Sequence, residues 1–77
     1  MNQEIQTIKV DNNDCIILTT ANVENEEYLY LAKIEENDIT GEFFVYQRDR
    51  LTGNLTKITD SEKLKRILLV VSANLVN

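Results

Sequence analysis

Short apolar runs separated by polar turn residues dominate the first three quarters of the chain, and none is long enough for a helix of average length. This pattern is typical of a β-meander, in which strands adjacent in sequence pair through short connections. We predict strands at residues 4–10, 15–20, 27–34, 42–48 and 55–58.

Polar residues separate these predicted strands. Asp11-Asn12-Asn13-Asp14 favours a tight turn, because Asp and Asn side chains form hydrogen bonds with nearby backbone. Residues 21–25 and 35–41 are expected to be polar connections. In the segment 49–54, Gly53 can take a positive φ angle and so close the last hairpin.

Three of the predicted strands, at residues 15–20, 27–34 and 42–48, carry large apolar side chains on both faces. Successive residues of a strand point to opposite faces of the sheet. In residues 27–34, one face therefore carries Leu29 and Leu31. The other face carries four side chains: Tyr28, Tyr30, Ala32 and Ile34. In residues 42–48, Phe43 and Val45 lie opposite Phe44 and Tyr46. Antiparallel sheets with one solvated face do not usually show this pattern.

The period of the pattern changes at Thr59. Thr59 and Glu62 match a capping box, in which each side chain bonds a backbone N–H at the start of a helix. An apolar stripe at helical spacing follows: Leu64, Ile67, Leu68, Val71 and Leu75. We therefore predict a helix capped by Thr59 that packs this stripe on the sheet. A sixth strand at residues 67–71 is the alternative, because three of these five apolar residues are β-branched.

The predicted fold class is α+β: a four- to five-stranded, mostly antiparallel β-meander with one C-terminal α-helix packed on it, in a single domain over residues 1–77. One helix covers only one face of the sheet. Either the sheet curls into a partial barrel that buries the second face, or another chain covers it; we favour the second interpretation. The candidate interface combines two off-stripe helix residues with two amphipathic tyrosines: Leu69, Val70, Tyr28 and Tyr30.

Charge is unevenly distributed along the chain. Asp and Glu number 13 and Lys and Arg number 8, for a net charge of −5. Residues 1–38 hold nine acids and two bases, a balance of −7, whereas residues 39–77 hold four acids and six bases, a balance of +2. This distribution favours attraction between the two halves, within one chain or between two, and the overall acidity disfavours nucleic acid and anionic lipid.

The residue types that most often carry catalysis are scarce. The chain has no histidine and one cysteine, Cys15, so we expect no disulfide, no structural zinc and no histidine-activated nucleophile. The paired acids Glu26-Glu27 and Glu35-Glu36 are interpreted as solvated residues at strand ends. We predict that the protein is not an enzyme and that it has no catalytic residues, no metal and no cofactor.

Two weaker binding patterns are also present. Asp11, Asn13 and Asp14 have calcium-loop spacing but lack the glycine and the distal glutamate of such a loop. A cluster of basic and aromatic residues on neighbouring strands is of the kind that stacks single-stranded RNA, without the matching motif: Tyr46, Arg48, Arg50 and Lys57.

The order of features over residues 24–69 carries a family resemblance. It consists of Glu-Tyr-Leu-Tyr-Leu at 27–31, an acidic loop at 35–38, Phe-Val-Tyr-Gln-Arg at 44–48, Gly53 before Leu55, and Ile58 followed by Asp60-Ser61-Glu62. In these segments the chain resembles the YrzB-type family, small acidic proteins of unknown function from Gram-positive bacteria. The resemblance implies a fold and a cytoplasmic setting, and no activity.

The sequence thus predicts a small, cytoplasmic, non-enzymatic protein that acts as a protein-interaction module or homodimer. The first twenty residues have neither signal-peptide nor membrane-span character, which also favours the cytoplasm. The alternative is an acidic, phage-borne inhibitor that imitates the charge of nucleic acid. An interaction module requires an exposed apolar patch, whereas a mimic requires ordered carboxylates on one continuous face.

Overall fold

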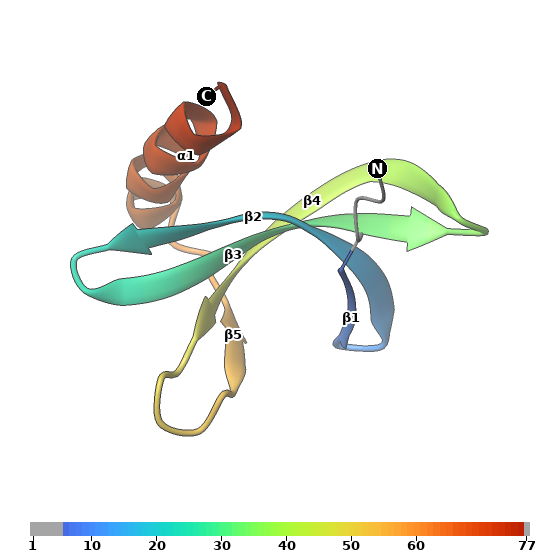
Figure 1. Ribbon diagram of the computed structural model, residues 1–77, viewed down its shortest axis with the longest axis horizontal. Helices are drawn as coiled ribbons and strands as arrows, with labels where there is room; N and C mark the ends of the chain where they lie inside the picture. Colours follow the sequence, from blue (N-terminus) through green and yellow to red (C-terminus); the bar gives the residue numbers. More distant parts are fainter. Residues whose placement is uncertain (1–5, 77) are drawn as a thin grey trace, which may run out of the picture.

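The computed structural model describes residues 6–76 of the chain. Five strands, β1 (Thr7–Val10), β2 (Asn13–Val23), β3 (Glu26–Glu35), β4 (Asp38–Arg48) and β5 (Leu55–Lys57), precede one helix, α1 (Ser61–Val76). The strands form one antiparallel sheet in sequence order, β1-β2-β3-β4-β5 (Figure 1). The predicted α+β meander with a C-terminal helix is confirmed, and residues 67–71 are helical.

The strands are longer than predicted because the turns between them are shorter. Three hairpins are closed by two residues each, Asp11-Asn12, Glu24-Asn25 and Glu36-Asn37, all with φ between 47° and 69°. Positive φ at both turn positions matches the twist of the flanking strands, and asparagine adopts it readily. The polar connections predicted at 21–25 and 35–41 are therefore wrong. Residues 4 and 5 of the predicted first strand lie outside the described residues.

Two irregularities bend the sheet. Leu18 is an extra residue of β2 between the pairs Ile17↔Leu31 and Thr19↔Tyr30. In β4, three residues (40–42) oppose Lys33 alone, and Gly41 has a φ of 94°. Such bulges bend a strand and increase its twist. The sheet consequently curls into a half-barrel, with the β1–β2 hairpin folded down at the end away from α1 (Figure 1).

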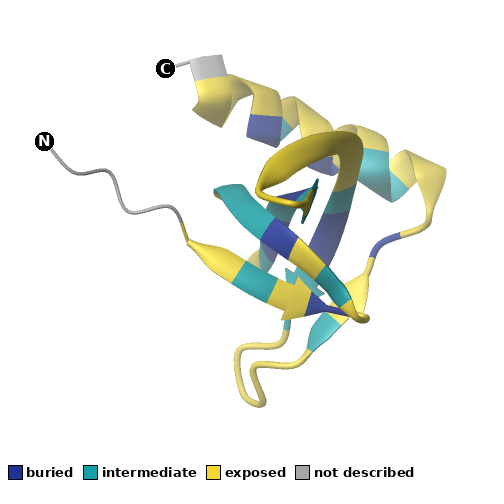
Figure 2. Cartoon of the chain, turned by 90° about the vertical axis from the view of Figure 1, so that its right-hand side faces the viewer, coloured by how far each residue is buried: buried dark blue, intermediate teal, exposed yellow. Residues whose placement is uncertain are grey.

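Buried residues lie both on the strands and on α1 (Figure 2), and they form one core on each face of the curled sheet. The helix-side core contains Ala21, Tyr28, Val45, Ile58, Ile67 and Val71. The opposite core contains Val10, Cys15, Leu29, Leu31 and Tyr46. The prediction that Tyr28 and Tyr30 lie on the opposite face of β3 from Leu29 and Leu31 is thus confirmed. The favoured interpretation, that another chain covers the second face, is wrong: Leu29 and Leu31 are fully buried within one chain because the sheet curls around them.

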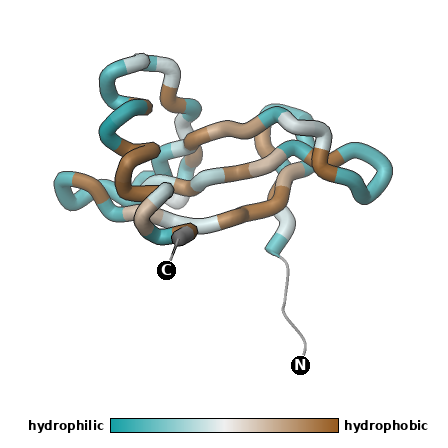
Figure 3. The backbone as a smooth tube through the Cα atoms, turned by 90° about the horizontal axis from the view of Figure 1, so that it is seen from above, coloured by the Kyte–Doolittle hydropathy of each residue, from teal (hydrophilic) through white to brown (hydrophobic). Residues whose placement is uncertain are grey.

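Hydropathy along the backbone follows this arrangement. The apolar segments lie in the middle of the strands and along the helix, and the hairpin turns are hydrophilic (Figure 3). The turns can therefore remain solvated while the strand centres supply both cores.

A hydrogen bond closes the curl. The Tyr46 hydroxyl on β4 donates to Asp11 Oδ2 in the β1–β2 turn at 2.6 Å. Burial, the hydrogen bond to Asp11 and the charge of Asp11 together raise the pKa of Tyr46 to about 12, and burial is the largest of these causes. The neutral phenol thus ties the first hairpin to the fourth strand.

Tyr46→Phe removes this bond while keeping the ring in the core. We expect the free energy of unfolding at pH 7 to fall by about 1 kcal/mol. Since the folded-state pKa, about 12, lies above the unfolded value of about 10, the contribution is complete below pH 10 and is lost as the pH rises through 12.

Urea denaturation of the wild type and Tyr46→Phe at several pH values measures the difference in their free energies of unfolding. This difference should become smaller above pH 10. Tyr30→Phe, which keeps the ring that stacks on Phe43, is the control. Equal stability of wild type and Tyr46→Phe at neutral pH would show that the bond contributes nothing.

The helix begins one residue later than the capping box requires. Asp60 is the N-cap, since its Oδ2 accepts a hydrogen bond from the Lys63 backbone N–H at 3.1 Å. The prediction that Thr59 caps the helix is wrong. Aspartate is among the best capping residues, and its charge also interacts favourably with the positive end of the helix dipole.

Two polar contacts show how α1 is oriented over β2. Arg66 Nη1 lies 3.2 Å from Glu24 Oε1, and Asn74 Nδ2 donates to the Thr20 carbonyl at 3.0 Å. The helix therefore runs antiparallel to β2. Eight residues of helix and four of strand both span about 12 to 13 Å, so the two contacts fit together.

This rotation corrects the predicted apolar stripe. Ile67 and Val71 are buried and Val70 packs against the helix-side core, whereas Leu68 is 38% and Leu75 52% exposed. Leu69 is 73% exposed and lies off the buried face as predicted. Val70 was wrongly placed outside the core, and Leu68 wrongly at its centre.

Asp60→Ala should lower the free energy of unfolding by about 1 kcal/mol, the usual effect of removing a cap. Thr59→Ala is the matched control, and we expect a change of less than half that size. Chemical denaturation followed by circular dichroism measures both. A larger loss for Thr59→Ala than for Asp60→Ala would contradict the assigned cap.

Candidate functional site

An open apolar hollow lies beside the outer edge of β4, and we call it the β4–α1 groove. Its volume is about 460 Å³, and its lining is Tyr30, Phe43, Phe44, Val45, Lys57, Ile58, Thr59, Leu64 and Leu68. Consecutive strand residues point to opposite faces, so a hollow touched by Phe43, Phe44 and Val45 together lies at the edge of the strand.

Aromatic and aliphatic groups form the groove. The rings of Phe43 and Tyr30 are stacked with centroids 5.8 Å apart, and Phe43 remains 49% exposed. Lys57 Nζ lies 4.8 Å above the Phe44 ring, an ordinary cation–π distance. The lining is mostly apolar, so the groove is suited to binding an apolar side chain.

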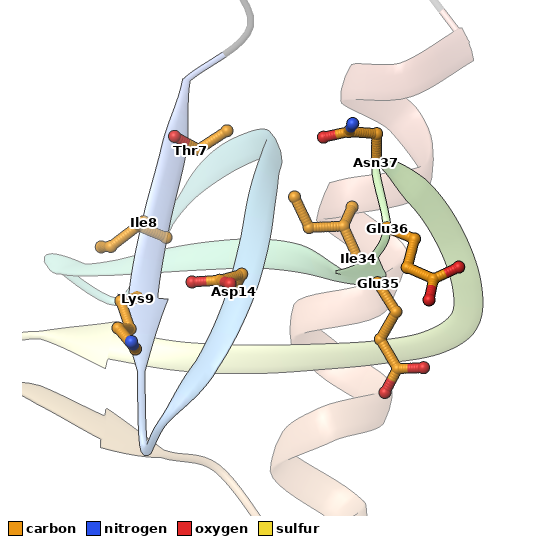
Figure 4. Close-up of a pocket in the computed structure, with 8 residues that line it drawn as sticks. All are labelled: Thr7, Ile8, Lys9, Asp14, Ile34, Glu35, Glu36 and Asn37. Atoms are coloured by element: carbon orange, nitrogen blue, oxygen red, sulfur yellow. The ribbon is translucent and has the colours of Figure 1, made fainter.

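A second open hollow, of about 760 Å³, lies between β1 and the β3–β4 turn (Figure 4). Its lining is Thr7, Ile8, Lys9, Asp14, Ile34, Glu35, Glu36 and Asn37. In Figure 4 Ile34 extends toward β1, whereas the side chains of Glu35 and Glu36 point away from it. Within residues 6–76, no three acidic or cysteine side chains gather closely enough to hold a metal ion.

The four residues of the predicted interface do not form one exposed surface. Tyr28 is only 3% exposed in the helix-side core, and Val70 packs against the same core. Tyr30 lies in the β4–α1 groove, and Leu69 is on the exposed side of α1. Tyr28 and Val70 are therefore corrected to core positions, because the helix covers that part of the sheet.

The exposure of Phe43 and Leu68 in the groove was not predicted: Leu68 was expected in the helix stripe packed on the sheet, and Phe43 on one face of the strand at 42–48. One signal does point to Phe43: the predicted strand 55–58 is too short to pair with all of 42–48. The exposure of Leu68 follows from the rotation of the helix, which tertiary contacts decide.

The carboxylate pairs take part in surface contacts. Glu26 Oε2 accepts a hydrogen bond from Gln47 Nε2 at 2.8 Å, and Glu27 Oε1 lies 3.8 Å from Arg48 Nη1. Glu35 lies 3.6 Å from the Lys33 ammonium group. Each contact is explained by ordinary cross-strand or same-face pairing.

The basic and aromatic cluster considered for RNA is likewise used within the fold. Tyr46 is only 2% exposed, so its ring cannot stack on a base, and Arg48 pairs with Glu27. In the β4–β5 turn, the backbone N–H groups of Thr52 and Leu51 donate to Asp49 and lower its pKa. These bonds fix the turn locally.

Cys15 is fully buried in the second core. Burial raises the pKa of its thiol, the charge of Asp14 raises it further, and the charge of Lys33 acts in the opposite direction. A buried thiol of raised pKa is a poor nucleophile, because only the thiolate attacks.

We expect Ellman's reagent to react with Cys15 more than about a hundredfold more slowly in the native protein than in concentrated urea, because the open state is rarely populated. Absorbance of the released thiolate measures the rate. The urea reaction is the internal control for thiol content. Comparable rates in the two conditions would contradict the burial of Cys15.

No protein family, curated protein or solved structure gives a significant match to this chain. The resemblance to the YrzB-type family therefore stays a prediction from sequence. In the part of the chain that the structure describes, α1 is the only helix, and it is neither long nor apolar enough to cross a membrane.

Proposed function

We propose that this chain is a small, non-enzymatic, cytoplasmic protein-interaction module that binds a protein partner through the β4–α1 groove. The observation that carries the proposal is the exposure of Phe43 and Leu68. The other large apolar residues of the groove pack against the two cores: Tyr30, Leu64 and Phe44. Apolar side chains gathered in one exposed hollow commonly mark a binding site.

Burial of this surface supplies a driving force for binding. A phenylalanine or leucine side chain contributes about 1.5 to 3 kcal/mol when it is fully transferred from water. About half of the Phe43 surface and nearly two fifths of the Leu68 surface can still be covered by a partner, since these residues are 49% and 38% exposed. An aromatic ring in a preformed pocket is also a typical energetic centre of a protein interface.

The homodimer that the sequence suggested has less support than a foreign partner. Its main argument was an uncovered second face, and the curled sheet buries that face. Its second argument was attraction between oppositely charged halves. Arg66 pairs with Glu24 and Arg48 with Glu27, so this attraction is used within one chain.

The alternative of a nucleic-acid mimic also has less support. A mimic requires carboxylates that project together from one face, free to replace phosphates. Here Glu24 and Glu27 each lie within 4 Å of a basic side chain of the same chain, and Glu35 and Glu42 share the ammonium group of Lys33. We also propose membership of the YrzB-type family, and a cytoplasmic setting in which the single thiol remains reduced.

Photo-crosslinking tests the proposed surface. A photoreactive phenylalanine at position 43, expressed in the native cell, is expected to give a discrete protein adduct. Leu68→Glu in the same chain should abolish it, because a buried charge opposes binding in an apolar groove.

The matched control carries the photoreactive residue at position 51, since Leu51 is 96% exposed and lies outside the groove. Purified protein should meanwhile elute with the mass of a monomer in size exclusion with light scattering. Equal adducts from positions 43 and 51, or none from either, would overturn the proposal.

A further inference from the structure

The outer edge of β4 is open along more than half of its length. β3 pairs with β4 from Asp38 to Arg48, but β5 pairs only with Tyr46–Arg48 on the other side. One further bond joins the Ile58 N–H to the Val45 carbonyl at 2.9 Å. Within residues 6–76 no strand lies beside residues 38–44 on that side. Such an edge presents unpaired backbone donors and acceptors.

The open edge leads directly into the β4–α1 groove. Phe43 and Phe44 belong to both, being the last residues of the open segment and part of the groove lining. A strand laid along this edge continues the sheet in place of β5, and an alternate side chain of it reaches the groove. Backbone pairing and an apolar pocket are thus adjacent.

The charge around the open edge is negative. Four carboxylates, Glu35, Glu36, Asp38 and Glu42, lie on or beside the β3–β4 hairpin tip, and one base, Lys33, lies among them, a balance of −3. Asp38 and Glu42 are on β4 itself and are exposed. A segment that carries lysine or arginine at this end complements the edge.

We propose that the open edge of β4 binds an extended segment of a partner protein by β-strand addition. An apolar side chain of that segment occupies the β4–α1 groove, and basic residues lie along Asp38 and Glu42. This inference rests on the proposed interaction function and specifies the conformation and charge of the partner.

A second copy of this chain fits the edge poorly. Antiparallel pairing of two β4 edges brings Asp38 and Glu42 of each copy close to those of the other, and like charges across a strand pair are destabilising. The bulge at 40–42, where Thr40 Oγ1 accepts the Glu42 N–H and donates to the Lys33 carbonyl, is the same for any added strand, so charge is what distinguishes a second copy from a basic segment. Charges and bulges are features by which natural edges avoid self-association.

The probe is a random octapeptide library displayed on phage. The library is selected against the full chain, and bound phage are eluted with buffer that contains no competing ligand. We expect the selected peptides to combine lysine or arginine near one end with an aromatic or aliphatic residue. One selected peptide is then synthesised with single N-methyl groups along its backbone. Because only alternate amides of an added strand face its neighbour, methylation should weaken binding by about fivefold or more at alternate positions and little between them.

Protein variants test the charge and the site. Glu42→Lys should weaken binding of the synthetic peptide by about tenfold, whereas Glu62→Lys, an equal change of net charge in the first turn of α1, should alter it less than about twofold. Circular dichroism verifies that both variants are folded. Amide hydrogen exchange over residues 39–45 should slow when the peptide binds.

The outcomes separate the two proposals. Binding that Leu68→Glu abolishes, but with no alternation in the methylation series, overturns strand addition and leaves the interaction function standing. Acidic rather than basic selected peptides overturn the proposed partner charge. A dimer in light scattering whose 39–45 amides are protected identifies a second copy as the occupant and overturns the foreign segment. A library that yields no groove-dependent binder overturns both proposals.

Discussion

The burial of both faces of β3 is the constraint on which the rest of the structure depends. Leu29 and Leu31 on one face and Tyr28 on the other are all at most 3% exposed, yet residues 6–76 contain a single helix. The helix packs on one face of β3, and the curled sheet itself must bury the other face. Bulges in β2 and β4 provide the bend, and the bond between Tyr46 and Asp11 holds the first hairpin in the curled position.

The same curl determines where the chain is left open. β4 is long because it takes part in the bend, and β5 is short because the chain leaves the sheet after Lys57 to form α1. The mismatch in length leaves the first half of β4 without an outer neighbour. The rotation of α1 then directs Leu64 and Leu68 toward that edge, so that the open backbone and the apolar groove arise from one set of packing requirements.

The order of strands, the two faces of β3 and the C-terminal helix could be predicted from sequence, because each depends on local periodicity. The turn lengths could not, since Glu24-Asn25 and Glu36-Asn37 have no glycine and their positive φ values depend on asparagine and on strand twist. The helix cap was misplaced by one residue because Thr59 and Asp60 are both good caps. The groove was missed because the exposure of Phe43 and Leu68 depends on contacts distant in sequence, such as Arg66 with Glu24.

The uneven charge along the chain has a different meaning in three dimensions than in sequence. Acids of the first half that lie near α1 or β4 are paired with Arg66 and Arg48 of the second half. Within the described residues, no basic group lies within 4 Å of Glu36 or Asp38 at the β3–β4 tip. Exposed ion pairs contribute little to the free energy of unfolding, so pairing Glu36 and Asp38 within the chain would stabilise the fold only slightly. Because these acids lie beside an open strand edge, they repel a second copy of the chain and attract a basic segment. Backbone hydrogen bonds would allow many different strands to pair with this edge, and the negative charge determines which of them bind.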